Sequence, residues 1–214
     1  MHGVTINGLH NYYNLGLIMN TREVPLPKPK TETISISGMD GKLDITGATT
    51  DGKVKYDNRT IKLKFTLPSG DFEERKSEIA NLFNGKMCEL VFDDDSFFKY
   101  IGRCTISKYT HKENYRVIEM SFDCEPYKRE INDISFIYSI NTNEKEIALQ
   151  NLEMWVEPKV IVIGSARVVY DGVIYNISEG YSYPFILKSG TQFLKISSTT
   201  SNSSIQFIYT RGQL

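Results

Sequence analysis

The sequence contains few of the residues on which most metal-binding and catalytic sites depend. Its 214 residues include three cysteines and three histidines. Cys88, Cys104 and Cys124 are odd in number and widely spaced in apolar runs, which excludes a disulfide framework and a zinc knuckle and predicts buried thiols. No histidine has a second ligand at metal-binding spacing. We therefore expect no metal site and no cofactor.

Targeting, membrane and catalytic signatures are also missing. No basic segment followed by an apolar block opens the chain, and no apolar run reaches the length of a membrane span. A serine nucleophile elbow and a phosphate-binding loop are absent as well. The net charge of -1 gives no global basis for nucleic-acid binding. The chain is thus expected to be non-enzymatic, with no catalytic residues and no membrane contact.

What dominates the first half of the chain is the stretch of residues 34–65, which encloses two turn signals, Asp40-Gly41 and Asp51-Gly52. Asp-Gly supplies the positive φ that tight turns need. Over residues 61–65, apolar and polar side chains alternate, which is typical of a half-buried strand. The stretch predicts paired strands that suit assembly better than a chemical reaction.

If residues 34–65 form a hairpin, five cations fall on one side of it. This predicted basic face consists of Lys53, Lys55, Arg59, Lys62 and Lys64. It has two interpretations. It is either a solvated strand face on which lysine blocks edge-to-edge pairing, or a face turned toward an acidic partner or passing DNA.

A proline-rich segment, residues 21–30, precedes this stretch. Pro25, Pro27 and Pro29 stand at alternate positions, where they remove backbone donors and hold the chain extended. The pattern predicts an extended arm near residues 20–32, which includes Glu23. Such an arm either wraps its own domain or reaches a neighbouring subunit.

A single helix is predicted over residues 71–84, with Asp71 as N-cap and Gly85 just beyond the C-terminus. The three aspartates at 93–95 are predicted to form a solvated hairpin turn. Pro126 and the charged residues after it end a strand and predict a boundary between domains 1–130 and 131–214.

The second domain shows short strand signals and no helix-length pattern. Asp171-Gly172 between β-formers is its strongest hairpin signal. Strands are expected at 134–140, 146–150, 158–163, 167–170, 173–177, 185–187, 193–197 and 205–209. This spacing favours a β-sandwich, so the expected fold class is mainly β with one helix.

Two aromatic residues of this domain, Tyr181 and Tyr183, lie in a loop bracketed by Gly, Ser and Pro. Their rings are either folded back over the sandwich or partly exposed. Exposed rings at such a place contact a glycan or a protein partner.

Taken in order, these pieces resemble the distal tail protein family of long-tailed bacteriophages and prophages of Gram-positive bacteria. The resemblance rests on motifs that stand in family order along residues 1–130, and on pattern beyond. These motifs are Gly38, Asp40, Gly41 and Asp44 in ISGMDGKLDIT, the pair Tyr56-x-x-Arg59, the helix near residue 75, and the closing Cys124-Glu125-Pro126-Tyr127.

The resemblance implies an N-terminal ring-forming domain, with an arm over the neighbouring copy of a homo-hexamer, and a C-terminal galectin-like β-sandwich. Glu23, Pro25, Pro27 and Pro29 then belong to the subunit interface, and the predicted basic face looks toward the bore or a partner. The ring serves as baseplate hub at the virion tail tip. It joins the tail tube protein to the tail-associated fibre or lysin protein, and double-stranded DNA passes through without specific binding. Synthesis is expected in the host bacterial cytoplasm.

The alternative from another class is a carbohydrate-binding β-sandwich adhesin. Such a protein recognises host cell-wall glycan through stacking rings, here Tyr181 and Tyr183.

Overall fold

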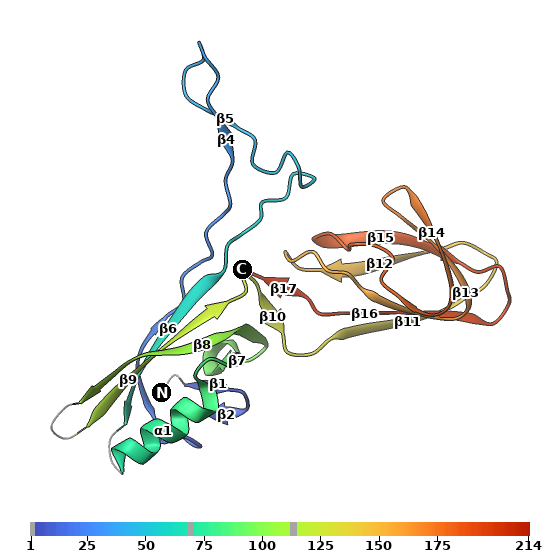
Figure 1. Cartoon of the computed structure of the whole chain (residues 1–214). Helices are drawn as coiled ribbons and strands as arrows, with labels where there is room; N and C mark the ends of the chain where they lie inside the picture. Colours follow the sequence, from blue (N-terminus) through green and yellow to red (C-terminus); the bar gives the residue numbers. More distant parts are fainter. Residues whose placement is uncertain (1–2, 68–70, 112–114) are drawn as a thin grey trace. The chain divides into compact units, whose positions relative to one another are not determined.

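The protein divides into two compact units, each with its own apolar core. The computed structural model describes residues 3–67, 71–111 and 115–214 (Figure 1). The first unit comprises Met1–Lys128 together with Leu214, and the second comprises Arg129–Gln213. The two clusters of buried side chains share no residue.

The first unit is built on an antiparallel sheet with the strand order β2-β1-β7-β8-β9-β6-β3. The strands are β1 (Val4–Ile6), β2 (Leu9–His10), β3 (Ile18–Glu23), β6 (Arg59–Leu67), β7 (Met87–Phe92), β8 (Phe98–His111) and β9 (Arg116–Cys124). Along β6, Ile61 and Leu63 are buried while Lys62 between them is exposed. The predicted period of two is therefore confirmed for this strand.

Helix α1 (Phe72–Phe83) connects β6 to β7 and covers part of the core. Asp71 caps it, since its carboxylate accepts hydrogen bonds from the backbone N–H of Glu73 and of Glu74, each at 3.1 Å. Ile79 and Phe83 are buried. The helix and its N-cap are confirmed as the sequence predicted them.

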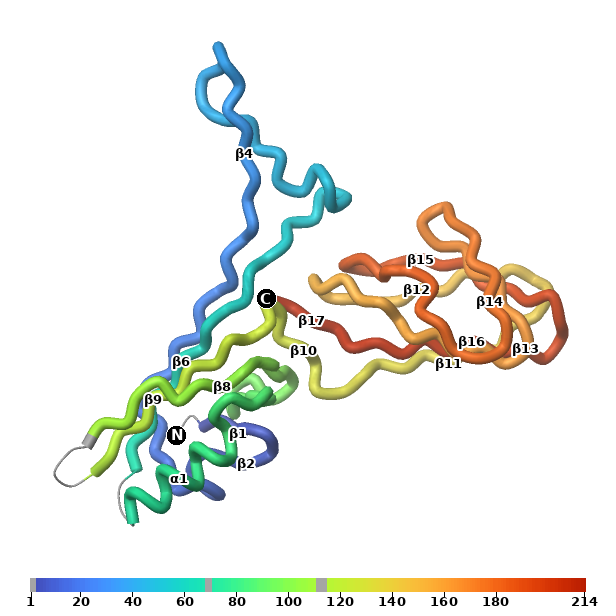
Figure 2. Tube along the Cα trace, in the orientation of Figure 1, coloured from blue at the N-terminus to red at the C-terminus, as the bar shows by residue number. Residues whose placement is uncertain are grey.

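Between β3 and β6 the chain leaves the sheet as a long projection, residues 24–58, called the arm below. Figure 2 traces it outward along one leg and back along the other. Near the tip the short strands β4 (Thr33–Ile34) and β5 (Leu43–Asp44) pair. Toward the base the legs are joined by Lys30 N to Lys55 O at 2.8 Å, Asp57 N to Lys28 O at 2.9 Å, and the bridge between Pro29 and Tyr56.

The arm differs from the sequence prediction in two respects. Residues 20–23 of the predicted arm belong to β3, where Glu23 pairs with Lys62. Residues 34–58, which were predicted as strands of a sheet hairpin, form the tip and the returning leg instead. The physical reason is that β3 and β9 occupy both edges of β6, which leaves no edge for residues 34–58 to pair with.

The second unit is a sandwich whose layers share one long, bent strand. Its strands are β11 (Ile134–Ile140), β12 (Lys145–Asn151), β13 (Lys159–Tyr170), β14 (Val173–Ser182), β15 (Gly190–Ser197) and β16 (Ser203–Tyr209). Two short strands, β10 (Lys128–Glu130) and β17 (Gly212–Gln213), pair with each other outside this sandwich. The first part of β13 pairs with β16 and the last part with β15. The register of β13 shifts at Gly164, where φ is +84° and a Cβ would stand 2.6 Å from Ser203 Oγ, so only glycine fits.

The predicted strands of this unit are mostly confirmed. Asp171 (φ 53°) and Gly172 (φ 76°) form the two-residue turn between β13 and β14, as expected of a type I′ hairpin. The predicted strands 158–163 and 167–170 are one strand, because the bulge near Gly164 interrupts the pattern without ending the pairing. Of 185–187, only the isolated bridge from Leu187 to Val156 forms.

The thiols yield a first testable prediction. All three cysteines are buried, and burial raises the pKa of Cys104 and of Cys124 from 9.0 to about 12. The unfolded thiols ionise above pH 9, whereas the folded ones stay protonated. The free energy of unfolding is therefore at its full value below pH 9 and falls as the pH rises toward 12. We expect the free energy of unfolding to fall by about 1.4 kcal/mol per thiol between pH 8 and pH 10.

Urea titrations at the two pH values measure this loss. A thiol reagent should also react with these cysteines only after unfolding. Equal stability at pH 8 and pH 10, or fast labelling of the native protein, contradicts the expectation.

Candidate functional site

The arm carries the most exposed apolar surface of the first unit. Every residue from 31 to 44 is exposed, as are Glu23, Pro25 and Pro29, whereas Pro27 is buried. The large apolar side chains exposed on the arm are Leu26, Ile34, Ile36, Met39 and Leu43, with Leu26 at 74%. Large apolar side chains exposed together on one segment are typical of a protein contact. The sequence analysis identified the prolines and missed these exposed apolar side chains. The alternation of apolar and polar residues over 34–36 could have indicated them.

The base of the arm is held by two of the sequence motifs, which meet in space. Arg59 Nη2 donates a hydrogen bond to the carbonyl oxygen of Pro126. The ring of Tyr56 meets the ring of Tyr127 edge-to-face at 6.0 Å. The ammonium of Lys53 lies 5.4 Å from the centre of the Tyr127 ring. These contacts fix the direction in which the arm leaves the sheet.

The predicted basic face does not form as a ladder, and Arg59 is not part of it. Arg59 is 3% exposed and faces the core, where burial lowers the pKa of its guanidinium. Its odd position on β6 places it on the side of Ile61, opposite Lys62 and Lys64. Lys53 and Lys55 lie on the returning leg of the arm, away from β6.

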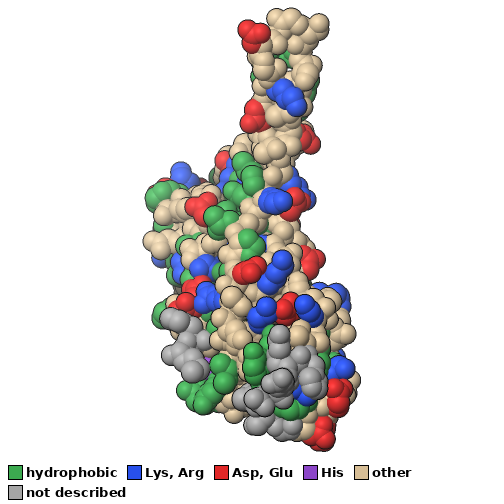
Figure 3. Space-filling model, turned by 90° about the vertical axis from the view of Figure 1, so that its left-hand side faces the viewer, with side chains coloured by type: hydrophobic (Ala, Val, Ile, Leu, Met, Phe, Trp, Pro, Cys, Tyr) green, Lys and Arg blue, Asp and Glu red, His purple; other side chains and the backbone are tan. Residues whose placement is uncertain are grey.

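Charges of both signs share the outward side of β6. Lys64 Nζ lies 2.9 Å from a carboxylate oxygen of Glu119, and this hydrogen bond lowers the pKa of that carboxyl. Lys62 stands opposite Glu23 on β3. On the side of the molecule that Figure 3 presents, cationic and anionic side chains are interspersed. The outward side of β6 therefore carries charges of both signs and is not a basic face.

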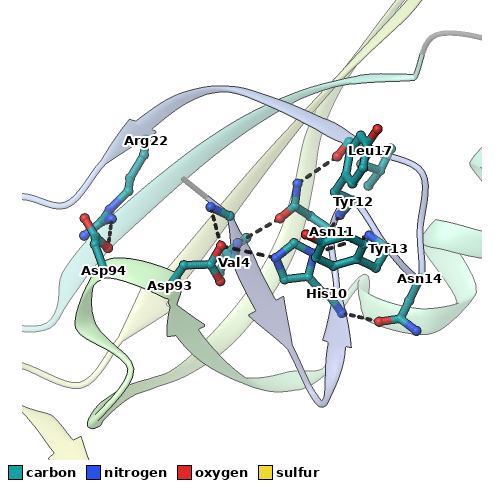
Figure 4. Close-up of polar contacts among 11 residues, drawn as sticks. Val4, His10, Asn11, Tyr12, Tyr13, Asn14, Leu17, Arg22, Asp93 and Asp94 are labelled. Carbon is teal, nitrogen blue, oxygen red and sulfur yellow. Dashed lines mark hydrogen bonds and ion pairs between the residues drawn. The ribbon is translucent and has the colours of Figure 1, made fainter. Parts of the chain in front are cut away.

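The aspartates at 93–95 form the predicted turn between β7 and β8, with Asp93 and Asp94 exposed, and they also make polar contacts with other parts of the chain (Figure 4). Asp93 Oδ2 accepts a hydrogen bond from Gly3 N at 2.9 Å and lies 3.3 Å from His10 Nε2. Arg22 Nη1 lies 2.5 Å from Asp94 Oδ1. Lys128 Nζ lies 2.7 Å from Asp95 Oδ2. The exposed turn is therefore confirmed, whereas its ion pairs were not predicted because the cations come from distant parts of the chain.

A rigid turn next to this cluster presents two tyrosines that the sequence analysis did not nominate. The buried side chain of Asn11 accepts from Val4 N at 2.8 Å and donates to Leu17 O at 2.7 Å. Tyr12 is 48% exposed and Tyr13 is 82% exposed. In the sequence, this exposed pair is indicated only by two adjacent tyrosines between two asparagines.

Tyr181 and Tyr183 are both exposed, at 71% and 56%. On its sheet Tyr181 stands beside Ile161, and the ammonium of Lys159 lies 4.9 Å from its ring centre. The same row continues through Gln206 to Ile137, which is 68% exposed. A glycan subsite needs several hydrogen-bonding groups around a stacking ring. The row around Tyr181 thus combines aliphatic side chains with Lys159 and Gln206, a composition that also suits a protein contact.

The residues that the structure describes hold neither a candidate metal site nor a candidate membrane-spanning helix. No group of three or more His, Cys, Asp or Glu side chains is placed to hold a metal ion within residues 3–67, 71–111 and 115–214. Within the same ranges, no helix is long and apolar enough to cross a membrane.

Comparison with known proteins identifies a family and a solved structure of similar fold. Residues 8–129 match the family described as "Phage tail protein RIFT-related domain". The whole chain is similar in fold to the Dit protein of SPP1, described as "a Paradigm of Hub Adsorption Apparatus in Gram-positive Infecting Phages". The TM-score is 0.67 and the identity 14%, over 100% of both chains. No curated protein matches the sequence.

Proposed function

Because this chain belongs to the family of phage tail proteins with a RIFT-related domain, we propose that it is the hub of a tail tip, a hexameric ring that joins the tail tube to the tail-associated fibre or lysin protein. The family and the Dit fold confirm the resemblance to distal tail proteins. The protein is thus a structural component of a virion tail. The hexameric ring, the two partner proteins and the passage of DNA are what we propose beyond this.

The observation that carries the proposal is the arm. It contributes no residue of the segment 31–44 to the core of its own unit, and it exposes large apolar side chains there. Fully burying one exposed side chain of this size contributes about 1.5–3 kcal/mol. Ile34, Ile36, Met39 and Leu43 are 42–46% exposed, so each gains about half of that and the four together gain about 3–6 kcal/mol. This sum reaches the lower end of an association cost of about 4–15 kcal/mol. When a chain of copies closes into a ring, one more contact forms without binding another copy. The closed ring is therefore more stable than the open chain.

The mixed charge of the sheet supports a bore that lets DNA pass without holding it. Tight binding to the DNA backbone requires many cations free to replace counterions. On β6, Lys64 is already paired with Glu119, and Lys62 stands opposite Glu23. A bore lined by such a surface attracts DNA weakly at most.

Light scattering of the purified full chain tests the proposal. We expect the mass of a hexamer at micromolar concentration, and retention of that mass in the double variant Tyr181→Ala, Tyr183→Ala. Neither protein should be retained on host cell-wall glycan. The adhesin is supported instead if the wild-type protein is a monomer that binds glycan and the double variant does not bind it.

A further inference from the structure

The first unit contains an apolar groove between α1 and β8. Its floor is formed by Ile79 and Ala80 of the helix together with Ile106 and Ile118 of the sheet, and its volume is about 280 Å³. Ile79 and Ile118 belong to the core, whereas Ala80 and Ile106 remain partly exposed. Apolar side chains that cover these two residues therefore extend the core outward.

One wall of the groove is the edge of β8 beyond the end of β7. The pairing of β7 with β8 ends at Met87, which stands opposite Arg103. Further along this edge, Ile106 N donates a hydrogen bond to Asn84 Oδ1 at 2.9 Å, and Asn84 also lines the groove. From Lys108 to Thr110, β8 pairs with β9 on the opposite edge. The edge beside the groove is therefore a template for one further strand.

Two lysines at the mouth of the groove decide which kind of strand this edge accepts. Lys76 and Lys108 line the groove and are exposed, and no carboxylate is among the described residues that line it. Lys76 Nζ lies 5.1 Å from the centre of the Tyr109 ring, so the helix holds this ammonium over β8. Its ion pair with Glu73, at 3.4 Å, is exposed and contributes little, so it exchanges easily for another carboxylate. Such an edge disfavours neutral and basic strands and favours an acidic one.

We propose that the groove binds an extended segment of another protein, which pairs as a strand with residues 108–110 of β8. Apolar side chains of the segment cover Ala80 and Ile106, and its carboxylates face Lys76 and Lys108. Main-chain hydrogen bonds then supply the affinity, while the groove and the two ammonium groups select the sequence. The inference rests on the proposed function for the identity of that protein, a neighbour of the hub in the tail, whereas the site itself does not depend on ring formation.

A fluorescein-labelled peptide that alternates valine with glutamate tests the charge preference. Fluorescence anisotropy should show that the full chain binds it, and that a matched peptide of valine and lysine binds about a hundredfold more weakly. In the variant Lys76→Glu, Lys108→Glu the preference should be reversed, because the lysine peptide then meets opposite charges. The control variant Lys145→Glu, Lys195→Glu makes the same change in net charge on the second unit and should keep the wild-type preference. Circular dichroism checks that both variants fold. Failure of the glutamate peptide to bind wild type, or an unreversed preference in the groove variant, overturns the proposal.

N-methylated peptides test whether the segment pairs as a strand. In a paired strand, the N–H groups of alternate residues point to the same side. A glutamate peptide methylated on its valine nitrogens and one methylated on its glutamate nitrogens should therefore differ, since one keeps its affinity and the other loses about tenfold. Equal affinities of the two methylated peptides contradict strand pairing.

Light scattering in the presence of saturating glutamate peptide separates this site from the contacts between copies. The mass of the assembled protein should be unchanged, because the groove takes a segment of another protein. Dissociation of the assembly by the peptide means that a second copy occupies the groove, and it overturns the proposal. If wild type is a monomer that binds the peptide, the proposed function fails and the site stands. If wild type assembles and does not bind the peptide, the site fails and the proposed function stands.

Discussion

Replacing residues 31–54 with Asn-Gly is expected to abolish assembly and leave the first unit folded. Lys30 N donates to Lys55 O at 2.8 Å, so the two legs are already paired where the cut would be made. A two-residue Asn-Gly loop closes such a pair as a type I′ turn. The exposed apolar side chains that remain outside the core, Ile34 to Leu43, are removed with the segment. We expect a monomer with a melting temperature within a few degrees of wild type.

Size-exclusion chromatography with light scattering measures the assembly, and thermal unfolding followed by circular dichroism measures the fold. The control is the full-length variant Ser35→Ala, Ser37→Ala, which alters the same segment without removing apolar surface and should assemble normally. An assembly of unchanged mass after the arm is shortened, or a collapse of the melting temperature, would show that the arm serves another purpose.

The largest expected effect on stability comes from Gly102→Ala in β8. A Cβ at this position would stand 2.5 Å from Cys124 Sγ and 2.6 Å from the carbonyl oxygen of Asp123. The oxygen belongs to the backbone of the paired strand β9, which cannot yield without breaking the ladder. Overpacking of this kind costs about 1–3 kcal/mol, and contact with backbone favours the upper end.

Urea unfolding with a probe in each unit detects this loss. Only the transition of the first unit should move, since the second unit has a separate core. Thr105→Ala, an exposed change on the same strand, serves as control and should stay within about 0.5 kcal/mol of wild type. Equal stability of Gly102→Ala and wild type contradicts the packing described for β8 and β9.

The fold was predictable where local chemistry decides it. Asp71 caps α1 through its own side chain, and Asp171-Gly172 forms a hairpin through its own backbone angles, so both can be recognised from a few neighbouring residues. The alternation along β6 follows from burial of one face. The mainly β class and the sandwich follow from the repetition of such signals.

The candidate site was less predictable because distant residues decide it. Whether residues 34–58 pair in the sheet depends on β9 already occupying an edge of β6, a fact that no local pattern contains. Arg59 looked like part of a basic surface, and its carbonyl partner at Pro126 becomes visible only when the two strands are aligned. The ion pairs of the aspartates at 93–95 could not be predicted for the same reason, since Arg22 and Lys128 come from far along the chain.

Electron microscopy of negatively stained full-length protein tests the central claim most directly. The account predicts closed particles with sixfold symmetry and a central opening, which disappear when residues 31–54 are replaced. Single compact particles at every concentration, or open chains of variable length, would contradict it.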